Sequence, residues 1–306
     1  MLVLYTFYHV LVPILIPMAI GALLHRKFEF NLGSFSKLIL YYFVPALAFV
    51  KVYQAKLPGT LIITVFGFLI IQFIAIVIIG YTISHLLKYS KPLSASFANS
   101  VCLTNNGNIG IPINSIAFKQ DPFAMSIQIM VVVFELFVTF TFGLINSSKA
   151  TSNLKSSLLQ FAKMPVLYAI IIGSIFNFFN IQIPEPIFLP ISNIADGMLS
   201  FALVSIGAQI SSTKFSKNTS PVFLSSLTRL IISPICAFFI IKLLSLQAIT
   251  AQTLFIASAI PTSRNSAALA LEYGNEPGFA AQAVLVSTLL SSITLTFVIN
   301  FAQKLF

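Results

Sequence analysis

The chain has 306 residues, of which 58% are hydrophobic and only 8% are charged, and its mean hydropathy is +0.97. Soluble globular domains carry about 25% charged residues, so this composition excludes a soluble protein and predicts a polytopic membrane protein. The net charge of +10 does not indicate nucleic-acid binding, because the basic residues lie mostly in short loops and form no stripe interleaved with exposed aromatics.

Apolar segments of about 20 residues, the length that a helix needs to cross a bilayer, recur ten times along the chain. We therefore predict an all-α protein with ten transmembrane helices. The expected spans are residues 5–24, 36–54, 60–87, 94–117, 122–145, 164–181, 192–210, 219–244, 249–273 and 278–301.

The distribution of Lys and Arg predicts the orientation of these spans. If the N-terminus faces outside, ten of the 17 basic residues fall in cytoplasmic loops and five on the outer side, while Arg229 and Arg264 lie within spans. Because cytoplasmic loops carry the excess of positive charge, we expect both termini outside. The membrane expected is the plasma membrane, which in a bacterium is the inner membrane.

Two halves of five spans each would have opposite orientations, and a faint sequence repeat supports this arrangement. Proline and glycine stand eight apart in both Pro13–Gly21 and Pro165–Gly173, and Asp121-Pro122 before the fifth span parallels Glu276-Pro277 before the tenth. We predict one repeat over 1–145 and a second over 164–306. A Ser- and Lys-rich cytoplasmic linker, 146–163, would join them.

Two spans are interrupted at matching places in the two halves. The fourth contains Leu103–Asn114, with Asn105, Asn106 and Asn108, two glycines and a proline, and the ninth contains Ala257–Ala267, with a proline followed by polar residues. Such sequence cannot continue as an ordinary helix, and it is tolerated in a membrane only where it is buried in protein or lines a wet cavity. A pair of broken spans in corresponding positions predicts the substrate site of a secondary transporter.

At each interruption a new half-helix begins with free N–H groups and the positive end of its dipole. Pro112 suits the first turn of the first of these, with Asn106 or Asn108 as its cap. If the two interruptions cross, their polar groups would converge on a volume that suits an anion, most naturally a carboxylate. The alternatives are structural bonding by the asparagines and simple kinks at the prolines. The candidate substrate-binding residues are Asn105, Asn106, Asn108, Pro112, Pro261, Thr262, Ser263, Arg264 and Asn265.

Three charged residues lie inside predicted spans. Arg264 is expected to contact either the substrate or a partner carboxylate, Glu135 or Glu272, because an arginine is costly at this depth. Glu135 is a candidate proton carrier, because burial disfavours its charged form. Neutralisation of Arg229 is the slightly favoured alternative for Glu135, since both charges need a partner.

Motifs for catalysis and for cofactors are missing from the sequence. It contains no phosphate-binding G-x-x-x-x-G-K-[ST], no H-E-x-x-H for zinc and no G-x-S-x-G nucleophile turn, and its two cysteines and three histidines lack metal-ligand spacing. We therefore expect no enzyme activity and no cofactor. The energy for transport would come from an ion or substrate gradient.

The interruptions also identify a family. Asn-Asn-Gly-Asn-Ile-Gly-Ile-Pro at 105–112, Ala-Ile-Pro-Thr at 259–262 and Tyr-Phe-Val-Pro-Ala-Leu at 42–47 resemble the auxin efflux carrier family of bacterial permeases and plant auxin exporters. The resemblance covers the whole chain. The chain departs from the family pattern in two places, because it lacks the large cytoplasmic loop of long plant exporters and a proline expected in 198–207. These departures argue against plant-type regulation and against auxin as the substrate.

The resemblance implies an inverted five-plus-five repeat whose spans four and nine cross at Pro112 and Pro261. Spans one, two, six and seven would form a scaffold, often dimeric, against which a transport domain of spans three to five and eight to ten moves. Members carry organic anions such as malate, malonate or auxin, so a bacterial, malate-permease-like member is expected to carry a small carboxylate. From the scaffold of the family, a homodimer is expected.

The leading functional prediction is therefore a secondary active carrier that moves a small carboxylate by alternating access, with an elevator-like movement. H⁺ or Na⁺ is the possible coupling ion. The alternatives are a sodium-coupled symporter of the bile-acid type and a membrane receptor that binds the same anion without moving it.

Overall fold

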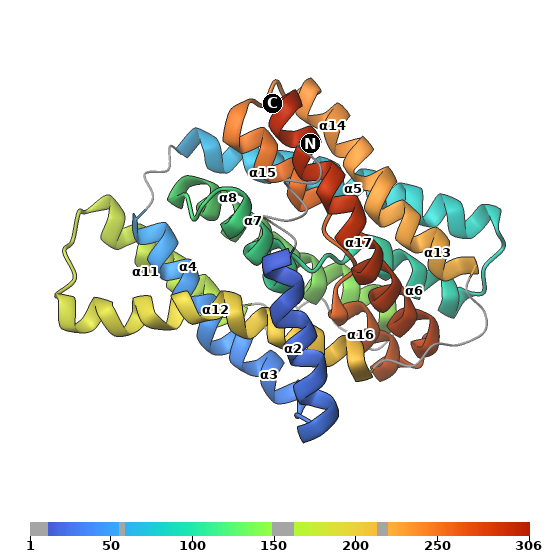
Figure 1. The fold of residues 1–306 in the computed structure, drawn as a ribbon. Helices are drawn as coiled ribbons and strands as arrows, with labels where there is room; N and C mark the ends of the chain where they lie inside the picture. Colours follow the sequence, from blue (N-terminus) through green and yellow to red (C-terminus); the bar gives the residue numbers. More distant parts are fainter. Residues whose placement is uncertain (1–11, 55–58, 149–161, 213–219) are drawn as a thin grey trace.

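The computed structural model describes residues 12–54, 59–148, 162–212 and 220–306, and the regular structure within them is entirely helical (Figure 1). Elements labelled η are single π-helical turns. The first half contains α2 (Val12–Phe28), α3 (Leu32–Leu38), η2 (Ile39–Phe43), α4 (Val44–Gln54), α5 (Gly59–Leu86), α6 (Lys91–Cys102), η3 (Asn106–Gly110), α7 (Ile111–Ala117), α8 (Pro122–Val138), η4 (Thr139–Gly143) and α9 (Leu144–Ser148). The second half contains α11 (Pro165–Phe178), α12 (Glu185–Ser212), α13 (Ser220–Leu227), η5 (Thr228–Ile232), α14 (Ser233–Leu243), α15 (Ala248–Ser258), α16 (Arg264–Tyr273) and α17 (Pro277–Leu305).

The prediction of an all-α polytopic membrane protein agrees with these helices. Five are long and apolar enough to cross a membrane, and 165–178 and 248–258 are shorter apolar helices. The five long helices are Gly59–Leu86, Pro122–Ser147, Glu185–Ala208, Ser220–Leu243 and Pro277–Leu305. Helices lie in all ten predicted ranges, the first described from Val12 and the fourth and ninth interrupted as expected. Most of the predicted linker 146–163 lies outside the described residues.

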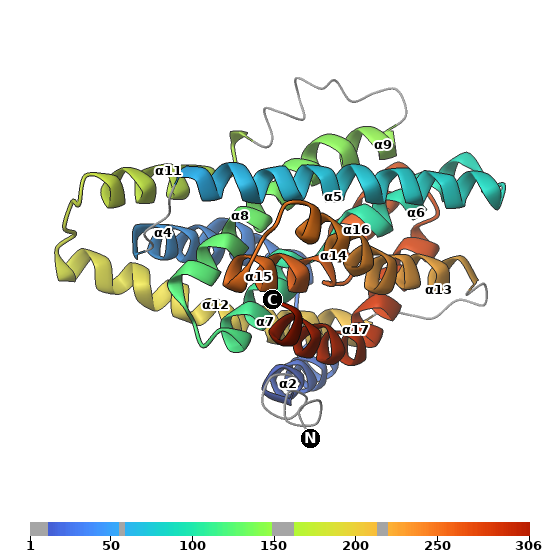
Figure 2. The ribbon, with the colours of Figure 1, turned by 90° about the horizontal axis from the view of Figure 1, so that it is seen from above.

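The helices form two groups. In the first, α12 packs along both α2 and α4, and α11 packs along α4; these blue and yellow helices occupy the left and the lower centre of Figure 1. In the second, α5 contacts α6, α8 and α14, while α17 contacts α13, α15 and α16. Figure 2 shows α5 running across the second group, and much of its surface is apolar and exposed, as a lipid-facing helix requires.

Glycines set the close helix crossings of the first group. A Cβ on Gly21 of α2 would lie 2.1 Å from the Val204 carbonyl oxygen of α12, and a Cβ on Gly207 of α12 would lie 1.8 Å from that of Met18. A Cβ on Gly173 of α11 would lie 3.1 Å from the Phe49 carbonyl oxygen of α4. Gly21 and Gly173 are the two glycines of the sequence repeat. Small residues at these positions let helix backbones approach closely.

Prolines explain three of the π-helical turns. Pro45, Pro112 and Pro234 are each the second residue of a helix that follows a π-helical turn directly, in α4, α7 and α14. Proline donates no backbone hydrogen bond, and its ring clashes with the carbonyl four residues earlier. A wider turn before the proline relieves this clash and lets the helix continue.

Candidate functional site

The two interruptions meet in the second group of helices. Thr104, after α6, and Thr262, before α16, form an isolated antiparallel bridge. The N–H of Asn105 donates to the Pro261 carbonyl at 2.9 Å, and the N–H of Ser263 donates to the Leu103 carbonyl at 2.8 Å. These bonds satisfy backbone groups that the broken helices leave without internal partners.

An amide network holds the first interruption on α8. The Nε2 of Gln128 donates to the Oδ1 of Asn106 at 3.1 Å and to its backbone carbonyl at 3.2 Å. The Nδ2 of Asn114 donates to the Oε1 of Gln128 at 2.9 Å, so one glutamine joins both ends of the interruption. The Nδ2 of Asn106 donates to the hydroxyl of Thr104 at 2.9 Å. Both asparagines and Gln128 are buried.

Glu135 caps the half-helix that follows the first interruption. Its Oε2 accepts the backbone N–H of Asn106 at 2.7 Å and that of Gly107 at 3.2 Å. This helix begins at Asn106, before Pro112, and Asn105 at its cap position makes no side-chain capping bond. The predicted capping by Asn106 or Asn108 is therefore wrong, because a carboxylate from α8 occupies the positive helix end.

Arg229, in η5, binds backbone carbonyls and not Glu135. Its Nε donates to the Ile260 carbonyl at 2.8 Å, its Nη1 to that of Val101 at 3.2 Å and its Nη2 to that of Ser258. The favoured prediction that Glu135 neutralises Arg229 therefore does not take the form of a direct ion pair among the described residues. Each charge is held by a different set of backbone groups, N–H groups for the carboxylate and C=O groups for the guanidinium.

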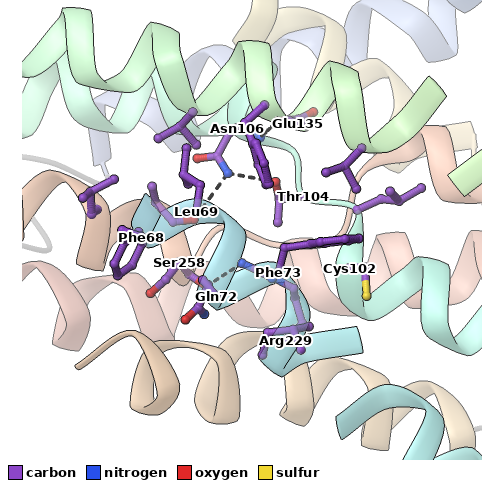
Figure 3. Close-up of a pocket in the computed structure, with 17 residues that line it drawn as sticks. Phe68, Leu69, Gln72, Phe73, Cys102, Thr104, Asn106, Glu135, Arg229 and Ser258 are labelled. Carbon is purple, nitrogen blue, oxygen red and sulfur yellow. Dashed lines mark hydrogen bonds between the residues drawn. The ribbon is translucent and has the colours of Figure 1, made fainter. Parts of the chain in front are cut away.

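Both charges nevertheless line one cavity of about 60 Å³ (Figure 3). The polar side chains on its wall are Gln72, Thr104, Asn106, Glu135, Arg229 and Ser258. The Nε2 of Gln72 donates to Ser233, but its Oε1 has no hydrogen-bond partner within the described residues. A cavity of this size and polarity has room for a few water molecules.

The second interruption leads into α16, whose N-cap and first turn carry three of the predicted residues. The Oγ of Ser263 accepts the N–H of Asn265 at 3.2 Å and so caps the helix. Arg264 is half-buried, and its Nη1 donates a long bond of 3.5 Å to the Leu32 carbonyl at the start of α3. Arg264 therefore lies where α16 of the second group approaches α3 of the first, outside the cavity of Figure 3.

The sequence model of a family described as membrane transport protein matches residues 6–299. The chain belongs to this family. It is the family of the auxin efflux carriers, as its motifs predicted, and membership indicates an integral membrane transporter. A search of curated proteins found no match to the chain.

The structure brings most predicted site residues of the transporter to the crossing, but their surroundings differ from one residue to the next. Asn106 and Glu135 face the cavity. Thr262 is fully buried, and its hydroxyl donates to the Ser100 carbonyl at 2.7 Å. Asn108 donates to the Oδ1 of Asn105 at 3.0 Å, and Pro112 is buried in α7.

Two buried glutamines of the transporter were missed from the sequence. Gln72 and Gln128 stand alone in the apolar runs of α5 and α8, and each binds an interruption or the helix beside it. An isolated amide in an apolar span is the signal that could have found them, because such a side chain needs an interhelical partner.

Proposed function

We propose that this transporter is a secondary active carrier of a small organic anion, a carboxylate such as malate, which it moves by alternating access. The observation that carries the proposal is the difference between the two half-helix ends at the crossing. The end at Asn106 already holds the carboxylate of Glu135, whereas the end at α16 carries a cation, Arg264. An anion from outside the protein would therefore bind at the start of α16.

The surroundings of that helix end suit such a ligand. Arg264 and Asn265 are half-buried, so their side chains keep access to solvent or to a ligand while the backbone below them is fixed by the Thr104–Thr262 bridge. A guanidinium binds a carboxylate through two parallel hydrogen bonds. The site lies next to Leu32 of α3, where one group of helices would slide past the other.

We further propose that the carboxylate also bears a hydroxyl group, whose hydrogen bond Asn108 would accept. Its Oδ1 is buried and has no hydrogen-bond partner among the described residues. The hydroxyl of a 2-hydroxy acid would supply the missing donor, and a buried acceptor left unpaired is costly. This preference distinguishes malate from a simple dicarboxylate such as succinate.

For the architecture, we propose ten spans in an inverted five-plus-five repeat, with both termini outside the bacterial inner membrane. The reciprocal contacts of α2 with α12 and of α11 with α4 support it, because the first helix of each half packs on the second helix of the other. These four spans would form the scaffold of a homodimer. The helices that contain the crossing would form the moving transport domain.

The test is uptake of labelled malate into liposomes that contain the purified transporter, under a proton gradient, a sodium gradient or neither. We expect saturable uptake that follows the proton gradient. Arg264→Gln should lower uptake at least about 10-fold, because a charged hydrogen-bonding partner of the carboxylate is lost. Lys242→Gln, which removes a cation stacked on Phe238 at the end of α14, serves as the control and should transport normally.

Three other outcomes would overturn the proposal. Uptake that follows only the sodium gradient would favour a symporter of the bile-acid type. Saturable malate binding without uptake would favour a receptor. Normal uptake by Arg264→Gln would remove the start of α16 from the substrate site.

A further inference from the structure

Three carbonyl oxygens, one from the helix end before the first interruption and two from the second interruption, converge on one guanidinium. Val101 lies in the last turn of α6, Ser258 is the last residue of α15, and Ile260 lies in the interruption that follows. All three carbonyls accept from Arg229. Carbonyls at a helix C-terminus lack internal partners and form the negative end of the helix dipole, and here two such ends from opposite halves of the chain meet.

This arrangement has the chemistry of a site for a monovalent cation. In transporters with broken helices, unwound carbonyls and half-helix C-terminal ends are the groups that coordinate a coupling Na⁺. Here the positive charge is supplied by the chain itself. Arg229 is only 3% exposed, and its planar fork reaches three oxygens at once, which a lysine ammonium on a flexible stem reproduces poorly.

We propose that these carbonyls form a monovalent-cation site that the side chain of Arg229 fills permanently, so that the crossing requires no bound Na⁺. The guanidinium joins the interruption of the first half, through Val101, to that of the second half, through Ser258 and Ile260. The inference deepens the proposed function, because it names the charge that stabilises the transport site and excludes sodium coupling at this position.

The cavity beside Arg229 shows what a free cation would meet if the side chain were shortened. The unpaired Oε1 of Gln72 and the carboxylate of Glu135 line the same cavity of about 60 Å³. Both are oxygen ligands of the kind that Na⁺ prefers. The Val101 and Ile260 carbonyls would lose the guanidinium donor, while the Ser258 carbonyl would keep only the hydroxyl of Ser233. Removing the guanidinium should therefore leave an open site for a small cation.

The experiment measures the thermal unfolding midpoint of the purified, full-length transporter in detergent. Wild type and Arg229→Ala are compared in NaCl, methylguanidinium chloride and N-methylglucamine chloride at equal ionic strength. We expect a wild-type midpoint that does not change between Na⁺ and N-methylglucamine. Arg229→Ala should unfold about 5–10 °C lower in N-methylglucamine and regain at least about half of that loss, saturably, with Na⁺ or methylguanidinium.

Arg264→Ala is the matched control, because it removes a second arginine at the crossing that does not bind this carbonyl cluster, and its midpoint should not respond to these cations. A wild-type midpoint that Na⁺ raises saturably would overturn the proposal, and so would an Arg229→Ala variant that no cation rescues. If Arg229→Ala cannot be purified, the Na⁺ titration of the wild type and the variant Arg229→Lys still test the proposal. The unfolding midpoint of both is expected not to depend on Na⁺. Because unfolding requires no flux, failure of carboxylate transport would not be confused with failure of this inference.

Discussion

Glu135 and Asn106 are joined by a hydrogen bond of 2.7 Å from the backbone N–H of Asn106 to the carboxylate, so a side chain of α8 caps the helix that restarts after the first interruption. The same Oε2 accepts the N–H of Gly107. Glu135 is buried, and it shares a cavity with Arg229, which binds the opposite, carbonyl ends of the neighbouring half-helices. Each charged side chain therefore lies at helix ends of the opposite sign, the carboxylate at N–H groups and the guanidinium at C=O groups.

The first prediction concerns stability and coupling at Glu135. Glu135→Ala would leave the buried N–H of Asn106 and the partly buried N–H of Gly107 without this acceptor, and we expect a loss of about 2–5 kcal/mol. Glu135→Gln keeps an oxygen acceptor and loses the charge, so its loss should be about 1–2 kcal/mol. If Glu135 also carries a proton during transport, Glu135→Gln should abolish accumulation driven by a proton gradient and retain exchange of labelled for unlabelled malate. Unchanged accumulation by this variant would reduce Glu135 to a structural cap.

A second prediction tests the amide network through a glycine. A Cβ on Gly110 would lie 2.5 Å from the Nε2 of Gln128 and 2.6 Å from the Oδ1 of Asn106. Gly110→Ala should therefore separate these two side chains, cost about 1–3 kcal/mol and abolish malate uptake. Gly67→Ala is the control, because a Cβ on Gly67 in α5 meets nothing within 4 Å. Its helix should be more stable by up to about 1 kcal/mol. Equal uptake by the two variants would show that this network does not position the site.

The third prediction concerns the contact between α2 and α12. A Cβ on Gly207 would lie 1.8 Å from the Met18 carbonyl oxygen, which is backbone and cannot rotate away. Gly207→Ala should push the two helices apart and lower the free energy of unfolding by about 1–3 kcal/mol, measured by denaturant or thermal unfolding. Substrate binding should persist, because the crossing belongs to the other group of helices. A variant as stable as Gly59→Ala, whose Cβ has open space, would contradict the close approach.

Sequence alone determined the class of this protein and the places where its helices break. Apolar runs of membrane length have one outcome in lipid, since every backbone group must be bonded within a helix. Leu103–Asn114 and Ala257–Ala267 could be read as interruptions because proline, glycine and asparagine compete with helix locally, whatever surrounds them. The glycines of the Pro–Gly repeat were visible in the sequence. Their structural role, which is close backbone contact between helices of opposite halves, was not.

Only the tertiary structure decided which partner each polar residue takes. Glu135 and Arg229 looked like a pair because the sequence shows charges and does not show backbone groups, and the unpaired N–H and C=O groups at helix ends exist only once the helices break and cross. Gln72 and Gln128 were passed over for the same reason, since an amide acquires its role from the helix that packs against it. Partner choice is a long-range property of packing, whereas span length and helix interruption are local properties of the chain.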